Sequence, residues 1–88
     1  MIQIQIDPRT LKRAEERGAT REEIEDVIRT GTPEQAGRNQ LSKSKIIKFR
    51  RIWRGEYYEQ KKVQVIYIEE QEVATTVTVY VFYGHWGT

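Results

Sequence analysis

Apolar and polar residues alternate at the start of the chain. Three isoleucines separated by single glutamines occupy residues 2–6, and this period of two is typical of a strand with one buried face. Asp7 then predicts a helix N-cap, because Pro8 follows it at the first helical position. We expect a helix from Pro8 to about Arg17, and Gly18 supplies the left-handed residue that ends it.

The next segment predicts a second helix. Thr20 and Glu23 have the spacing of a capping box, in which each side chain bonds the backbone of the other residue. Three apolar residues between 24 and 28 follow at i, i+3 and i+4, which indicates one buried stripe. Gly31, followed closely by a proline, ends this helix.

The second half of the chain predicts strands. Residues 32–44 are polar and contain Gly, Pro, Asn and Ser, so we expect a loop there. Three strands are expected next, at about residues 45–53, 57–68 and 74–83. Turns at 54–56 and 69–72 are short, and sequential strands with short turns form an antiparallel meander.

These elements predict a single α+β domain over residues 1–88, because so short a chain cannot build two independent cores. The order is β-α-α-β-β-β, with two helices packed on one face of an antiparallel sheet. The first strand can join this sheet only at an edge or beside a late strand.

The last strand is apolar on both of its faces. Three alternating valines at 77–81 point one way, and we expect the helices to cover them. Tyr80 and Phe82 point the other way, together with Ile66 and Ile68 of the preceding strand. An uncovered apolar patch with aromatic rings predicts a protein partner, a dimer interface or a ligand groove. Alternatively, the sheet curls and the long loop covers this face.

Positive charge is concentrated in one segment. Residues 38–54 carry seven basic residues and no acid, whereas 7–35 and 55–88 have net charges of −2 and −3. The candidates for binding RNA phosphates are Lys43, Lys45, Lys48, Arg50 and Arg54. Period-two spacing places the last three of these on one strand face. The alternative reading is a solvated edge strand whose charges prevent aggregation.

Several classes of site are not expected. The chain has no cysteine and one histidine, so neither a disulfide framework nor a transition-metal site is predicted. It has no glycine-rich phosphate loop and no nucleophile elbow, and we expect no cofactor. No apolar run approaches the ~20 residues of a membrane span, and no signal-peptide pattern is present, so a cytoplasmic location without membrane contact is expected.

The two predicted helices contain a residue pattern that resembles that of a known family. Its residues are Arg13-x-x-x-Arg17-Gly18-x-Thr20-x-x-Glu23-Ile24-x-x-Val27-Ile28-x-x-Gly31, and the later segments YYEQKKVQVIYIEE and VTVYVFYGHW continue it. Together they resemble the bacterial proteins grouped as domain of unknown function 4258, a family similar to the BrnT and RelE toxins. The resemblance implies a RelE/ParE-like fold, ribonuclease activity that is often ribosome-dependent, and inhibition by an antitoxin. Many members have a histidine at the position of Arg9, so this chain departs from them there.

RNA cleavage by a 2′-hydroxyl group needs charge stabilisation at the phosphate and proton transfer on either side of it. Arg50 and Arg54, helped by Lys48, are our candidates for holding the phosphate. Tyr80 or His85 would move protons, since a histidine titrates near neutral pH. His85 has a simpler interpretation as an ordinary residue of the tail.

Two functions remain open from the sequence. The first is a toxin-like protein that binds RNA or the ribosome and, if active, is a metal-independent endoribonuclease. The alternative is a non-enzymatic module that retains the toxin fold and binds a partner protein or a second copy of itself through the Tyr80–Phe82 face.

Overall fold

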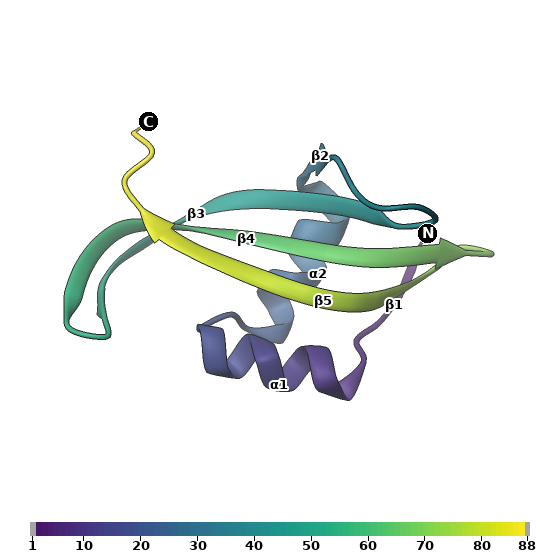
Figure 1. Cartoon of the computed structure of the whole chain (residues 1–88), viewed down its shortest axis with the longest axis horizontal. Helices are drawn as coiled ribbons and strands as arrows, with labels where there is room; N and C mark the ends of the chain where they lie inside the picture. The colour runs from purple at the N-terminus through teal and green to yellow at the C-terminus, as the bar shows by residue number, and fades with distance from the viewer. Residues whose placement is uncertain (1, 88) are drawn as a thin grey trace.

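A five-stranded mixed sheet runs the length of the molecule in the order β1-β5-β4-β3-β2 (Figure 1). Its strands are β1 (Gln3–Gln5), β2 (Thr32–Glu34), β3 (Leu41–Trp53), β4 (Glu56–Glu70) and β5 (Val73–Gly84). The helices are α1 (Pro8–Arg17) and α2 (Arg21–Thr30). This computed structural model describes residues 2–87.

The α+β class and the meander of β3, β4 and β5 are confirmed, but the sheet is not antiparallel throughout. β1 lies at an edge beside the last strand, and it runs parallel to β5 with Gln3 opposite Val73. A tight hairpin forces neighbouring strands to be antiparallel. Nearly the whole chain separates β1 from β5, so no turn imposes that direction on them.

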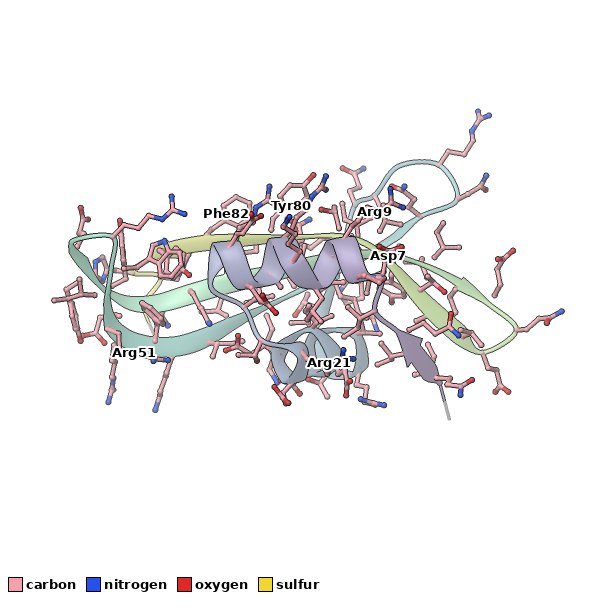
Figure 2. All side chains as sticks on the ribbon, turned by 90° about the horizontal axis from the view of Figure 1, so that it is seen from below. Asp7, Arg9, Arg21, Arg51, Tyr80 and Phe82 are labelled. Atoms are coloured by element: carbon pink, nitrogen blue, oxygen red, sulfur yellow. The ribbon has the colours of Figure 1, made fainter. Side chains whose placement is uncertain are left out.

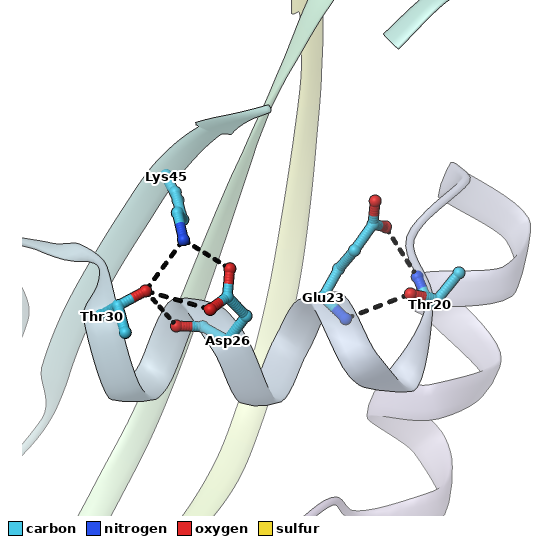
Figure 3. A network of polar contacts seen from close by, with 5 residues as sticks. All are labelled: Thr20, Glu23, Asp26, Thr30 and Lys45. Atoms are coloured by element: carbon cyan, nitrogen blue, oxygen red, sulfur yellow. Dashed lines mark hydrogen bonds and ion pairs between the residues drawn. The ribbon is translucent and has the colours of Figure 1, made fainter. Parts of the chain in front are cut away.

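Both helices begin and end as their capping residues predict. The Asp7 carboxylate accepts a hydrogen bond from Arg9 N at 2.8 Å, and Gly18 ends α1 with a left-handed φ of 91°. Thr20 and Glu23 form the reciprocal capping box of α2 (Figure 3). No helix within residues 2–87 is both long and apolar enough to cross a lipid bilayer.

The two helices do not share one face of the sheet, contrary to expectation. α2 packs against β3 and β4, whereas α1 lies along the β5 edge (Figures 1 and 2). In the described part of the chain, β1 pairs with β5 only as far as Thr75, which leaves the rest of that edge without a strand. Arg17 of α1 donates to Val79 O at 2.5 Å and Arg13 to Thr78 Oγ1 at 3.1 Å. The helix therefore satisfies and shields the exposed strand edge.

The core lies between α2 and the central strands. The apolar stripe of α2 forms one cluster with Ala14 of α1 and with β4 and β5, and the largest fully buried apolar side chains of this cluster are Ile24, Val27, Ile28, Val63, Val65 and Val79. The stripe predicted for this helix is thus confirmed.

A buried lysine connects both helices to the sheet. Lys61 of β4 is 3% exposed, and its ammonium donates to Gly18 O at 2.7 Å and to Glu23 Oε1 at 2.9 Å. The first contact holds the end of α1 and the second the first turn of α2. Burial of a charge is costly unless it is paired and hydrogen-bonded, and both conditions are met here.

The valine face of β5 differs from the expectation because the strand is bulged. Ile66 lies opposite Thr78 and Tyr67 opposite Thr76, so Val77 is the extra residue. Val77 is 40% exposed, whereas Thr76 and Thr78 are buried. The bulge shifts the period of two, so only the later valines of this strand point to the core.

Residues 32–44 are not a loop throughout, which corrects the sequence prediction. β2 and the start of β3 pair there with Glu34 opposite Ser42. Pro33 is tolerated because β2 is an edge strand, where a missing N–H is not needed by a second neighbour. Buried serines replaced the apolar residues that would have revealed the strand: Ser42 Oγ accepts from Gln64 Nε2 at 3.0 Å, and the Ser44 hydroxyl donates to the Glu34 carboxylate.

We predict that Glu23→Ala lowers the free energy of unfolding by about 3 kcal/mol, because it leaves the buried Lys61 ammonium without its counter-charge. Urea denaturation followed by circular dichroism measures this loss. The matched control is Glu22→Ala, which removes a neighbouring exposed carboxylate from the same helical turn and should cost less than about 1 kcal/mol. Equal losses in the two variants would contradict the role assigned to Lys61.

A second prediction concerns two glycines with positive φ. A Cβ at Gly18 would collide with the Tyr83 hydroxyl and press on the Trp53 ring, whereas a Cβ at Gly55 would meet nothing within 4 Å. Gly55→Ala should therefore cost only the left-handed strain of about 1 kcal/mol. Gly18→Ala should cost about 1–3 kcal/mol more, since overpacking adds to the same strain. Comparable thermal midpoints for the two variants would refute this.

Candidate functional site

A pocket of about 530 Å³ lies where the β3–β4 hairpin meets the end of β5. Its lining residues are Lys48, Arg50, Glu59, Gln60, His85 and Gly87. The structure thus brings together three residues that the sequence singled out: two of the basic residues of β3 and the histidine. It adds a carboxylate and an amide from β4.

A bulge in β3 brings the two cations to this pocket. Lys48 lies opposite Gln60 but Arg51 lies opposite Tyr58, so two residues of β3 face the single residue Glu59. Arg50 is one of the two, and it adopts a left-handed φ of 51°. Arg50 lines the pocket together with Lys48, and after the bulge Arg51 lies on the side of α2 (Figure 2).

Arg54 does not join Lys48 and Arg50, so the expectation that all three share a face is wrong. The bulge breaks the period of two, and Arg54 itself lies in the hairpin turn with a φ of 51°. Its guanidinium lies over the Trp53 ring and donates to Glu16 O at 3.4 Å. These contacts direct it toward α1.

The amide of Gln60 holds the tail that carries His85. Its Nε2 donates to Gly87 O at 2.9 Å, and its Oε1 accepts from Trp86 N at 2.6 Å. The imidazole Nδ1 of His85 accepts from Glu59 N at 3.4 Å. With Nδ1 acting as an acceptor, the neutral ring carries its proton on Nε2, which can donate to a ligand.

Glu59 places a carboxylate between the basic residues and the tail. Its Oε2 lies 3.6 Å from Arg50 Nε, and its Oε1 accepts from the Tyr57 hydroxyl at 3.0 Å. The hydrogen bond to Glu59 raises the pKa of Tyr57, because ionised Tyr57 could no longer donate it. The pocket therefore holds a carboxylate, two cations and an imidazole.

Aromatic rings pack beside the pocket around Tyr83. Trp53, Phe49 and Tyr58 lie 5.0, 5.1 and 5.5 Å from its ring centre, and Tyr58 also lies 6.0 Å from the His85 ring. The Tyr83 hydroxyl donates to Arg17 O at 2.6 Å, and burial raises its pKa. Tyr83 is thus a rigid support for the end of β5.

Lys43 and Lys45 lie on the face of β3 that α2 covers, and Figure 3 shows Lys45 there. Lys43 donates to Ile28 O at 2.8 Å, and Lys45 donates to Asp26 Oδ2 at 2.6 Å and to Thr30 Oγ1 at 2.9 Å. The bond from Lys45 lowers the pKa of Asp26. Neither lysine lines the pocket, and both connect β3 to α2.

Tyr80 lies outside the pocket, with Phe82, on the side of the sheet opposite α2 (Figure 2). Ile66 and Ile68 share this face, since they lie opposite Thr78 and Thr75. The candidate interface residues therefore lie together, separate from the pocket of candidate catalytic residues.

Sequence reasoning missed Glu59 and Gln60. Glu59 faces the bulge, which no periodic pattern indicated, and Gln60 acts on the tail through the side chain alone. The available signal was a polar pair between two tyrosines and two lysines in the first half of β4.

No protein-family model matches this chain, and no curated protein or solved structure is significantly similar to it. In residues 2–87, no group of three His, Asp or Glu side chains is placed to hold a metal ion.

We predict that Gln60→Ala releases residues 85–87 from the sheet. Both hydrogen bonds from Gln60 to the tail are lost, so backbone ¹⁵N relaxation should show fast motion at Trp86 and Gly87. Gln64→Ala is the control, because Gln64 lies on the same strand but bonds Ser42. An unchanged tail in Gln60→Ala would mean that other contacts hold it.

Proposed function

We propose that this chain is an RNA-binding, toxin-like protein that cleaves RNA without a metal ion. The observation that carries the proposal is the convergence of Lys48, Arg50, Glu59 and His85 in one pocket. Attack of a 2′-hydroxyl on a phosphate requires groups that stabilise negative charge and groups that move protons. Two cations, a carboxylate and a histidine can fill these roles.

In the proposed reaction, Lys48 and Arg50 bind the non-bridging oxygens of the scissile phosphate. Glu59 accepts the 2′-hydroxyl proton as the 2′-oxygen forms a bond to phosphorus. The neutral His85 ring donates a hydrogen bond from Nε2–H to a water molecule, and this water gives a proton to the departing 5′-oxygen as its bond to phosphorus breaks. The hydroxide that remains takes up the proton held by Glu59. The products are a 2′,3′-cyclic phosphate and a 5′-hydroxyl end, so atoms and charge balance.

The division of roles follows from the contacts of each group. Arg50 and Lys48 are exposed, so a polyanion can reach their cationic ends, and Arg50 also lies 3.6 Å from the Glu59 carboxylate. His85 Nδ1 is occupied by the Glu59 backbone, which fixes the ring and leaves Nε2 for the water molecule at the substrate. The toxin-like role and an antitoxin partner rest on the family resemblance described above.

We predict discrete cleavage of messenger RNA, with or without ribosomes, in the presence of EDTA, and products that end in a cyclic phosphate. His85→Ala and Arg50→Ala should each slow cleavage by about 100-fold or more. Arg51→Ala is the matched control, since it removes a neighbouring guanidinium that points to the other side of β3, and it should cleave normally. Cleavage unaffected by His85→Ala and Arg50→Ala would refute the assignment, and RNA binding without cleavage would leave a binding module.

A further inference from the structure

Tyr80 and Phe82 form an exposed aromatic pair on the open face of the sheet. They are 40% and 47% exposed, and their ring centres lie 6.5 Å apart with planes inclined by 28°. Both belong to the outward-facing set of β5, one strand period apart. Neither ring belongs to the hydrophobic core cluster.

The surroundings of the pair are polar and basic. Phe82 lies opposite Lys62, and Tyr80 lies opposite Gln64. The Arg17 guanidinium reaches over the strand edge to 5.4 Å from the Tyr80 ring centre. Lys62 pairs at 3.1 Å with Glu34, which comes from the far strand β2. The groups directly beside the two rings are therefore cations and an amide, and the apolar Ile66 and Ile68 lie farther along the same face of β4.

This composition favours a nucleic acid over a protein as the occupant. Cores of protein interfaces are contiguous, apolar and depleted in lysine, and here Lys62 and Gln64 lie directly beside the two rings. Proteins that bind single-stranded RNA combine exposed aromatic rings on a sheet with nearby cations, because each base offers a flat face for stacking.

The aromatic pair also continues from the pocket. Lys62, which faces Phe82, is two residues along β4 from Gln60, a lining residue of the pocket. Two residues of a strand span about 6.6 Å, so each ring can receive one of two successive bases. A strand held at the pocket by its phosphate can thus extend across Phe82 to Tyr80.

We propose that Phe82 and Tyr80 are a stacking platform for two adjacent unpaired bases of the RNA bound at the pocket. The inference rests on the proposed function and deepens it, because it specifies single-stranded RNA as the substrate. Phosphate contacts at the pocket supply sequence-independent binding, whereas the platform supplies discrimination against duplexes, whose bases cannot reach the rings.

The test is fluorescence anisotropy with a short labelled 2′-O-methyl oligonucleotide, which cannot be cleaved by 2′-hydroxyl attack, so that binding is measured without turnover. Tyr80→Ala and Phe82→Ala should each weaken binding roughly fivefold or more, with the salt dependence unchanged. Tyr80→Phe should bind normally because it keeps the ring. Ile68→Ala, exposed on the same face but aliphatic, is the matched control and should also bind normally.

Different variants test the stacking platform and the phosphate-binding pocket, so one proposal can be refuted without the other. Lys48→Ala and Arg50→Ala should weaken binding and reduce the salt dependence; if they do neither while the ring variants weaken binding, the pocket is wrong and the platform stands. Equal affinity of the ring variants and the wild type, or equal binding of duplex and single strand, overturns the platform. A dimer in sedimentation that Tyr80→Ala dissociates, with RNA affinity unchanged, would assign this face to a second copy instead.

Discussion

The structure depends on a single buried ammonium group. Lys61 is placed by β4 at the junction of the two helices, where it bonds the carbonyl of Gly18, the C-cap of α1, and the capping carboxylate of α2. This contact fixes Gly18 against Tyr83 and Trp53. Because Lys61 lies opposite Tyr83 in the ladder, the same contact sets the end of β5, from which the tail crosses to the pocket. Because water does not solvate the buried ammonium of Lys61, the junction is stable only in a geometry that supplies both hydrogen-bond acceptors.

The helices could be predicted almost residue by residue, since capping chemistry is local. Asp7, Thr20 and the two terminating glycines act within a few residues of their own position. The strands of the meander could also be predicted, because apolar residues and short turns mark them locally. The parallel direction of β1, the position of α1 along a strand edge and the serine-lined start of β3 depend on residues distant in the sequence. No local pattern records such contacts.

The candidate site was predictable in its residue types and less so in its geometry. Lys48, Arg50 and His85 were identified from charge and titration alone, and the structure brings them together. Arg54 was grouped with them by simple alternation, which a bulge cancels. Bulges are encoded by the fit of two strands rather than by a residue pattern. The effects of the β3 bulge on Arg54 and Glu59, and of the β5 bulge on Val77, therefore become visible only once the strands are paired.

The parallel pairing of β1 with β5 has a consequence for the order of assembly. It joins residues 3–5 to residues 73–75, so this closure spans most of the chain and is among the slowest steps available to it. Until β5 has been synthesised, Arg13 and Arg17 lack the groups they bond, and the tail lacks the strand that positions it. The strand and tail that complete the pocket are therefore the last parts to leave the ribosome, so the pocket can assemble only after synthesis of the described chain is almost finished.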